Sequence, residues 1–389
     1  MDILFFSLRG SMYRYFAMLC RELPLQTRLL DFSPTFYYTR GAPAPSECDV
    51  ALGIDFQLQR KRCKYRAPEW IWKIIGCYYS LQYRRFYRRF YYLIDREQPK
   101  CIALWNGHRL PEFAIKQLAR EFNIPVVHFE NGLLPNTTTF DLNGVNDRNS
   151  LPRCASFYRA YKPAHASTPI AERQLVTRKF HRAKRAHAGQ GEFFAPLPGK
   201  YIFVPFQVKF DSQILLNSPR IKTMYELYNW IEYVAENSCD NSIIFVIKEH
   251  PSDPHKYTDL YKNHPRIRFS NRDTQELITK SQAVVTVNSS VGLEALLLHR
   301  PVVVLGNACF AIEDLSYPVT SKEALVNMID KLKGWQPDVT LIEGFLSYLK
   351  EQYCLPVSWR NPDQQHIDAV TEKFKTVLAG GTRNGSQIT

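Results

Sequence analysis

Two carboxylates stand where the chain leaves an apolar run. Glu130 follows the run VVHF at 126–129, and Asp211 lies in the polar stretch QVKFDSQ at 207–213. Two acids placed across a cleft suit glycosyl chemistry, because one attacks or stabilises the anomeric centre while the other moves a proton. An acid in a loop is more often a solvated or helix-capping residue, so both interpretations stay open from spacing alone.

Other polar clusters also follow apolar runs that are typical of buried strands. Ligands of α/β proteins bind beyond the carboxyl ends of the strands. Strand ends are often polar only because they reach solvent, so a single cluster carries little information. Their recurrence in both halves of the chain predicts two α/β domains that face each other across a cleft. The clusters are at 106–109, 130–132, 207–213, 248–251 and 288–290.

The stretch VVTVNSSVGLEALLL at 284–298 is the clearest of these clusters. A buried strand brings Ser289 and Ser290 to the start of a helix, where free backbone N–H groups and the helix dipole favour a phosphate. Gly292 is expected to let the backbone approach that phosphate closely. The alternative is that one of the serines is only an N-cap.

The stretch FVIKEHP at 245–251 places two further candidate groups at a strand end. His250 precedes a proline and is therefore expected in an extended or turn conformation. An imidazole N–H donor or the Lys248 ammonium could neutralise a leaving phosphate there. A lone histidine is usually structural, so this stretch by itself is weak support.

The elements that would position these residues alternate between strands and helices, which is the pattern of parallel α/β sheets. Strands are predicted at 2–8, 26–33, 101–107, 124–132, 200–207, 242–251, 283–290 and 300–307. Helices are predicted at 9–23, 109–123, 220–237, 274–281 and 291–299. The fold class predicted is α/β, with two Rossmann-like domains facing a cleft.

The domain boundaries follow from the same pattern. A first Rossmann-like domain is expected at 1–157. A second one is expected at 199–335. A basic connection rich in Arg, Lys, His, Ala and Pro at 158–198 separates them, and a helical segment at 336–378 and a frayed tail at 379–389 follow.

Composition limits the possible classes of protein. A chain of 389 residues with 45% hydrophobic and 22% charged residues fits two globular domains. The net charge of +13 indicates an anionic partner: nucleic acid, anionic lipid or a phosphate-bearing substrate. Nine cysteines without a CxxC pair favour a reducing compartment. No apolar stretch approaches the length of a membrane span, and the apolar N-terminus is too short for a signal peptide. We therefore expect a cytoplasmic protein that is peripheral on the inner face of a membrane.

Residues 60–96 interleave basic and aromatic side chains. One interpretation is a membrane-surface segment, with aromatic rings at headgroup level and arginines on phosphates. Nucleic-acid binding by stacking and charge is a second, which no nucleic-acid motif supports. The plainest is an amphipathic helix with aromatic residues in the core and arginines in solvent. The membrane candidates are Trp70, Trp72, Arg84, Arg85, Arg88 and Arg89.

The motifs at these positions resemble the bacterial capsule polysaccharide synthesis family, the retaining β-Kdo transferases of capsule and lipopolysaccharide assembly. The matching strings keep the family's order over about 105–318. They are FENGLLP, GVNDRNSLPR, FQVKFDSQI, KEHP, VNSSVGLEAL and RPVVVLGNACFAIEDLSYP. Residues 1–100 match poorly. Asn131 stands where some relatives have an acid, and Glu249 where some have histidine.

The resemblance implies a GT-B glycosyltransferase that moves Kdo from CMP-Kdo to a glycan or glycolipid acceptor with retention. Asp211 matches the proposed nucleophile, Glu130 the proposed acid/base, and His250 and the two serines the donor phosphate site. No metal and no other cofactor are expected, since protein donors neutralise the phosphate. Further donor-binding candidates are Lys248, Asn288, Gln207 and Gln213. Further cleft candidates are Asn106, Arg109, Gly132, Arg153 and Pro251.

Two other functions remain compatible with these motifs. The His-Pro and Ser-Ser elements address CMP rather than the sugar, so a transferase for another CMP-linked acid sugar, such as sialic acid, would carry them too. A non-catalytic binding protein of polysaccharide assembly would be expected to lose them. Retention of Glu130, Asp211, His250 and both serines speaks against such decay.

Overall fold

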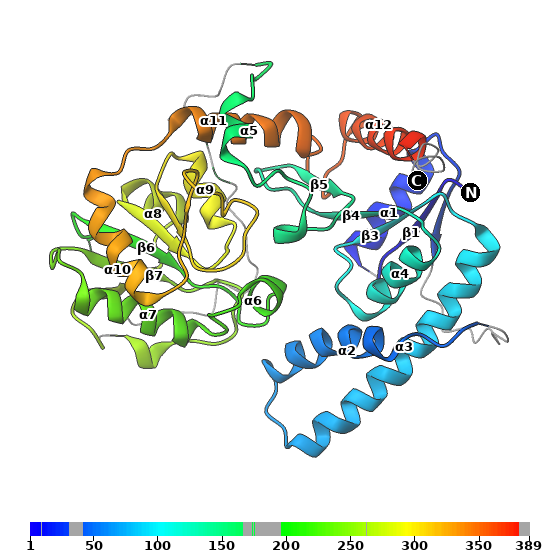
Figure 1. Ribbon diagram of the computed structural model, residues 1–389, viewed down its shortest axis with the longest axis horizontal. Helices are drawn as coiled ribbons and strands as arrows, with labels where there is room; N and C mark the ends of the chain where they lie inside the picture. Colours follow the sequence, from blue (N-terminus) through cyan, green and yellow to red (C-terminus); the bar gives the residue numbers. More distant parts are fainter. Residues whose placement is uncertain are drawn as a thin grey trace, which may run out of the picture. The chain divides into compact units, whose positions relative to one another are not determined.

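The computed structural model describes residues 1–8, 10–30, 42–165, 173, 175, 196–261 and 263–380. The chain forms two compact units, one of residues 1–150 with 353–389 and one of residues 151–352 (Figure 1). Each contains a mainly parallel sheet with helices on both faces. The prediction of two Rossmann-like domains is confirmed.

Unit 1, which denotes residues 1–150 with 353–389, holds a five-stranded sheet in the order β2-β1-β3-β4-β5. The first four strands are parallel, and β5 pairs antiparallel with β4. Its strands are β1 (Ile3–Phe6), β2 (Thr27–Leu30), β3 (Cys101–Trp105), β4 (Val126–Asn131) and β5 (Thr138–Asp141). Its helices are α1 (Ser11–Glu22), α2 (Glu47–Arg62), α3 (Glu69–Glu97), α4 (Leu110–Glu121), the 3-10 turn Asn146–Arg148 and α12 (Gln364–Gly380).

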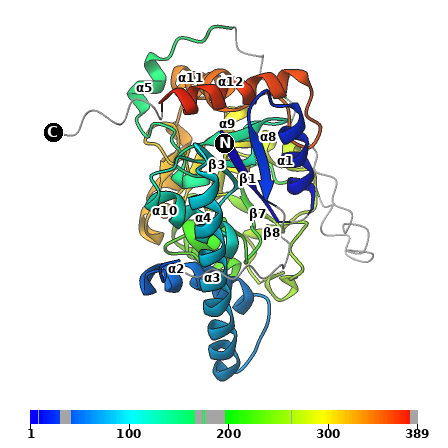
Figure 2. The ribbon, with the colours of Figure 1, turned by 90° about the vertical axis from the view of Figure 1, so that its right-hand side faces the viewer.

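The two faces of this sheet bury different helices. Helices α1 and α12 cover one face, and α2, α3 and α4 cover the other. Successive side chains of a strand point to opposite faces of the sheet, so Ala103 packs in the core with α1 while Leu104 packs in the core with α4. Helices α2 and α3 pair, and their connected ends project beyond the sheet of this unit (Figures 1 and 2).

Unit 2, which denotes residues 151–352, holds a fully parallel six-stranded sheet in the order β11-β10-β9-β6-β7-β8. Its strands are β6 (Tyr201–Pro205), β7 (Ile244–Lys248), β8 (Ile267–Phe269), β9 (Ala283–Thr286), β10 (Val302–Val304) and β11 (Tyr317–Pro318). Its helices are α5 (Ala155–Ala160), α6 (Ser212–Asn217), α7 (Met224–Asn237), α8 (Thr274–Lys280), α9 (Val291–Leu297), α10 (Lys322–Lys331) and α11 (Val339–Tyr348). Single turns at Thr258–Leu260, Leu332–Gly334 and Leu349–Tyr353 complete it.

The strand order of unit 2 is that of the dinucleotide-binding Rossmann fold, with the order reversing between β6 and β9. The crevice at such a reversal is the usual ligand site. Helix α7 begins at Met224 and not at the predicted residue 220. A capping box causes this, because the Thr223 hydroxyl accepts from the Glu226 N–H while Glu226 accepts from the Thr223 N–H.

The structure draws the unit boundaries at 150/151 and 352/353, instead of at 157 and 335. Most of the predicted C-terminal segment belongs to unit 1, because Val370 and Phe374 of α12 are fully buried against its sheet. The predicted connection 158–198 and tail 379–389 lie largely outside the described residues. No helix among the described residues is both long and apolar enough to cross a bilayer.

Candidate functional site

Three loops of unit 2 carry most of the predicted donor-side residues. They follow β6, β7 and β9, which are neighbours in the sheet, so the loops share its carboxyl edge at the strand-order reversal. Asp211 lies on the first loop, His250 and Pro251 on the second, and Ser289 and Ser290 on the third. The fold thus brings together side chains that are 79 residues apart in sequence, from 211 to 290.

Gln207 and Asn288 form a buried amide lock between two of these loops. The Gln207 side-chain amide donates to Asn288 Oδ1 over 3.0 Å, and the Asn288 backbone N–H donates back to Gln207 Oε1 over 3.2 Å. The Asn288 amide also donates to the carbonyls of Gln213 and Asn217. The side chains of Gln207 and Asn288 therefore make their hydrogen bonds within unit 2. Their role is to hold in place the loops that carry Asp211 and Ser290.

Asp211 is the N-cap of α6. Its Oδ1 accepts from the Gln213 N–H over 2.9 Å and from the Ser212 hydroxyl over 3.4 Å. The residue is exposed, and Oδ2 has no hydrogen-bond partner among the described residues. One carboxylate oxygen of Asp211 is therefore a helix cap, while the other makes no hydrogen bond with a described residue.

His250 starts a turn in which the Asp253 N–H donates to the His250 carbonyl. Pro251 occupies the second turn position, which its fixed φ favours. The Ser252 N–H donates to His250 Nδ1 over 3.1 Å. Since Nδ1 accepts this bond, the neutral ring carries its proton on Nε2 and offers it as a donor.

Lys248 is engaged elsewhere. Its half-buried ammonium donates to the Arg272 carbonyl over 2.7 Å and to the Thr274 hydroxyl over 2.9 Å, which ties β7 to the start of α8. Burial lowers the pKa of this lysine. Two of its three N–H donors are already used, so its contribution to a donor site is at most partial.

The two serines before α9 differ in role. Ser289 Oγ accepts from the Val291 N–H over 3.2 Å and so acts as a helix cap. Ser290 is exposed, and its hydroxyl has no partner among the described residues. A Cβ on Gly292 would lie 2.5 Å from the Phe310 ring, so packing against Phe310 explains this glycine without a bound phosphate.

The predicted acid/base lies at the carboxyl end of β4 in unit 1. Glu130 is half-buried and accepts from the Asn106 amide over 3.3 Å. The backbone and side-chain N–H groups of Asn131 both donate to its other oxygen over 2.8 Å. Asn131 is itself held by the Trp359 indole N–H over 3.0 Å. The carboxylate is therefore fixed by two asparagines.

The remaining cleft candidates divide between the units. Arg109 is exposed at the N-cap of α4 in unit 1. Gly132 closes the β4–β5 hairpin, since its N–H donates to the Thr137 carbonyl and a Cβ there would clash with that residue. Arg153 belongs to unit 2 and donates to the Leu151 carbonyl over 2.6 Å.

Sequence reasoning missed two buried acids near Glu130. Asp141 accepts from the N–H groups of Asn143, Gly144 and Ser150 and from the Ser150 hydroxyl, which fixes the loop between β5 and Ser150. Glu112 in the first turn of α4 is 2% exposed, and burial raises its pKa to about 8. The available sequence signal for Glu112 was an acid directly after a proline in the first turn of a predicted helix.

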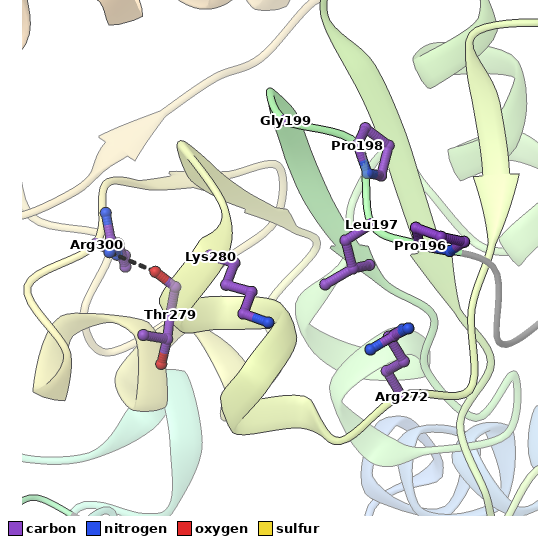
Figure 3. Close-up of a pocket in the computed structure, with 8 residues that line it drawn as sticks. All are labelled: Pro196, Leu197, Pro198, Gly199, Arg272, Thr279, Lys280 and Arg300. Carbon is purple, nitrogen blue, oxygen red and sulfur yellow. Dashed lines mark hydrogen bonds between the residues drawn. The ribbon is translucent and has the colours of Figure 1, made fainter.

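A cavity of about 600 Å³ in unit 2 shares no lining residue with these loops (Figure 3). Gly199, Lys280 and Arg300 precede β6, β9 and β10, so the cavity opens at the amino edge of the sheet. The other lining residues are Pro196, Leu197, Pro198, Arg272 and Thr279. Among the described residues, no three His, Cys, Asp or Glu side chains gather as metal ligands.

Comparison with known proteins places the chain in a family. The family described as capsule polysaccharide biosynthesis protein matches residues 157–351, which is half of the chain. Protein FixF of Sinorhizobium fredii is 36% identical over 278 residues, covering 70% of this chain and 65% of FixF. The capsule polysaccharide export protein KpsS of Escherichia coli is 25% identical over 292 residues, covering 60% of this chain and 72% of KpsS.

A solved structure shares the fold. The β-Kdo 2,7 transferase KpsC of Thermosulfurimonas dismutans superposes with a TM-score of 0.50 at 16% identity, covering 97% of this chain and all of that chain. The chain thus spans somewhat less than two thirds of the length of FixF and the whole of the matched KpsC chain. It belongs to the capsule polysaccharide biosynthesis protein family, and its two Rossmann-like units are those of a GT-B-like fold.

Proposed function

We propose that this protein is a glycosyltransferase that moves Kdo from CMP-Kdo to a glycan or glycolipid acceptor with retention of configuration. The observation that supports the proposal is that the loops of Asp211, His250 and Ser290 follow three neighbouring strands at the strand-order reversal of unit 2. An unpartnered carboxylate oxygen, an imidazole donor and an exposed hydroxyl suit a sugar linked to a phosphate. Membership of the capsule polysaccharide biosynthesis family supports the same class of reaction.

The proposed reaction has two steps. Asp211 Oδ2 attacks the anomeric carbon, the bond from that carbon to the CMP phosphate oxygen breaks, and CMP leaves with the bonding electrons. His250 Nε2–H and the Ser290 hydroxyl donate to the leaving phosphate. Glu130 then takes the proton of the acceptor hydroxyl, whose oxygen displaces Asp211 from the anomeric carbon. Two inversions give net retention.

The contacts of Asp211 suit a nucleophile. The N-cap bond from the Gln213 N–H fixes the position of one carboxylate oxygen at the start of α6. The buried bonds of Gln213 and Asn217 with Asn288 anchor α6, so the carboxylate is presented by a fixed helix end. A loosely held acid would need to be ordered at the moment of reaction.

The test is CMP release from fresh CMP-Kdo, with and without a panel of glycan and glycolipid acceptors. Asp211→Asn keeps an N-cap, because asparagine caps helices as well as aspartate does. We expect this variant to bind CMP as wild type does and to lose about a thousandfold or more in acceptor-dependent release. Asp273→Asn removes a charge from the N-cap of α8 and serves as the matched control.

Three results would contradict the proposal in different ways. Full activity of Asp211→Asn would remove that residue as nucleophile. Faster release from a CMP-linked sialic acid than from CMP-Kdo would change the donor sugar. No CMP binding by the wild type would remove the transferase function itself.

We also propose that helix α3 contacts an anionic membrane surface. Trp70, Ile74, Tyr78 and Leu81 are each 49–62% exposed. Their spacing of four, four and three residues places them on one face of the helix, which continues into the exposed Arg85 and Arg88. An apolar stripe bordered by arginines is the pattern of helices that lie in a lipid headgroup region.

Not all six residues predicted to contact a membrane are exposed in the structure. Trp72 is only 6% exposed, and its indole N–H donates to the Ala67 carbonyl. Arg84 pairs with Glu47 at 2.6 Å, and Arg89 is half-buried. Trp70 stays as a candidate because it is exposed on the apolar stripe, and Arg85 and Arg88 stay because they are exposed where the stripe ends.

A further inference from the structure

The cavity between α8 and the segment that leads into β6 is lined by three basic side chains (Figure 3). Arg272 and Lys280 border it from the two ends of α8, and Arg300 borders it from the segment before β10. Its volume of about 600 Å³ lies in the usual range for sites that bind small molecules. None of the three side chains comes from the loops that carry the proposed donor site.

Two of these cations share one acid. Arg272, Glu276 and Lys280 are each four residues apart, so their side chains lie along one face of α8. Arg272 Nη1 and Lys280 Nζ both donate to Glu276 Oε1 over 2.9 Å. The bond from Lys280, together with the one from Arg272, holds the pKa of the Glu276 carboxyl below its ordinary value, so this acid is charged at neutral pH. One negative charge therefore faces two positive charges.

Arg300 adds a third positive charge. Its Nη2 donates to the Thr279 carbonyl near the end of α8, which orients the guanidinium beside the cavity (Figure 3). Arg300 forms no ion pair with a described residue, and only one of its five side-chain N–H donors has a partner among them. The three cations and the single acid Glu276 leave this wall with a net charge of +2.

An apolar segment forms another wall of the cavity. Leu197 stands between Pro196 and Pro198, and all three line the cavity. Proline fixes its own φ and restricts the residue before it to extended backbone, so this short segment has little conformational freedom. A ring or a carbon chain can pack against Leu197 while the basic side chains hold an anion.

We propose that this cavity binds a phosphate monoester of a sugar or nucleoside, with its phosphate at Arg272, Lys280 and Arg300. A phosphate monoester carries a charge of about −1.5 to −2 at neutral pH, which matches the net charge of the wall, whereas one carboxylate would balance only half of it. Its terminal oxygens also accept from several charged donors at once. The sugar would then pack against Leu197. This site is separate from the proposed donor site and does not depend on the transferase function.

Isothermal titration with ribose and ribose 5-phosphate tests the cavity, because the two probes differ only in the phosphate. We expect ribose 5-phosphate to bind about tenfold or more tighter than ribose at low salt, and less tightly at high salt. AMP contains the same phosphorylated ribose with a base attached. Tighter binding of AMP than of ribose 5-phosphate would assign the nucleoside form, and equal or weaker binding of AMP would assign the sugar phosphate.

Lys280→Met and Arg300→Gln should each weaken the binding of ribose 5-phosphate about fivefold, because each removes a charged donor from the wall. Lys331→Met is the matched control, since Lys331 is likewise the exposed last residue of a helix, α10, and does not line the cavity. Glu276→Gln should instead tighten binding, because it removes the acid that competes for Arg272 and Lys280. Thermal unfolding of each variant confirms that it is folded.

Three results would overturn the cavity as a phosphate site. They are equal binding of ribose and ribose 5-phosphate, a phosphate preference that both cavity variants keep, and an equal loss in the Lys331→Met control. The last would show attraction by the overall charge of +13 alone. Weaker binding by Glu276→Gln would contradict the charge balance on which the choice of phosphate rests. Failure of the wild type to bind CMP would end the transferase proposal but would leave these titrations as they are.

Discussion

At the scale of single residues, the two proposed catalytic acids are fixed by different contacts. Asp211 Oδ1 accepts from the Gln213 N–H and the Ser212 hydroxyl at the start of α6, while Oδ2 has no hydrogen-bond partner among the described residues. Glu130 receives N–H donors on both oxygens, from Asn106 and Asn131. A nucleophile needs a lone pair without a competing donor, whereas an acid/base needs a fixed orientation toward the hydroxyl that it deprotonates. The contacts match the two proposed roles.

The buried acid Glu112 should make stability depend on pH. Its pKa is 4.5 when exposed and about 8 in the folded protein, so the folded state favours the protonated form. Its contribution to stability is complete below pH 4.5 and is lost as the pH rises through 8. Glu112→Gln should unfold at nearly the wild-type temperature at pH 5 and at a higher temperature at pH 8.5.

Thermal unfolding at the two pH values measures this, with Glu22→Gln as the exposed control on α1. The expected gain at high pH is a few kcal/mol at most. An equal difference between Glu112→Gln and wild type at both pH values would show that the carboxyl group is already ionised in the folded protein.

At the scale of elements, α12 decides the composition of unit 1. Its Phe374 ring lies 4.9 Å from Phe140, 5.7 Å from Phe5 and 6.2 Å from Phe129, so it joins three strands of the sheet. The segment before the helix brings Trp359 to Asn131 beside Glu130. The C-terminal part of the chain thus holds Asn131, which in turn donates to the proposed acid/base Glu130.

Removing the Phe374 ring should lower the stability of unit 1 substantially. Phe374→Ala removes a fully buried ring, and we expect the free energy of unfolding to fall by about 3–5 kcal/mol. Lys375→Ala on the same helix loses only an exposed pair with Glu372 and should change it by under about 0.5 kcal/mol. Urea unfolding compares the two, and similar costs would mean that α12 does not hold the core together.

At the scale of the whole molecule, the net charge of +13 favours any anionic surface. Charge alone attracts the protein weakly and from any orientation, whereas an exposed apolar stripe also inserts into the interface. The proposed membrane contact of α3 therefore predicts two separable effects, one that depends on lipid charge and one that does not.

Vesicle co-sedimentation separates these effects. Arg85→Gln with Arg88→Gln should weaken binding to vesicles containing phosphatidylglycerol by about tenfold or more, with no effect on neutral vesicles. Ile74→Ser with Tyr78→Ser should weaken binding to both. Leu52→Ser, an exposed apolar residue of α2 outside the stripe, is the control. Unchanged binding by both double variants would remove α3 as the membrane contact.

The sequence by itself determined the alternation of strands and helices and the polar residues that follow each strand. Both are local properties, because side-chain periodicity and turn chemistry act over a few residues. Since parallel strands end at one edge, the order of residues along the chain was enough to group Asp211, His250 and Ser290. The reversal of strand order between β6 and β9 then placed that group where ligands of this fold bind.

Only the tertiary structure decided which polar groups are already used and which helix faces meet solvent. The side chains of Lys248, Gln207 and Asn288 donate hydrogen bonds to other groups of unit 2. On α3, Trp72 is buried while Trp70 is exposed. The return of α12 to unit 1 also depends on residues far apart in the chain. Hydrophobic burial and hydrogen bonding between such residues are set by the packing of the whole unit, which no local pattern records.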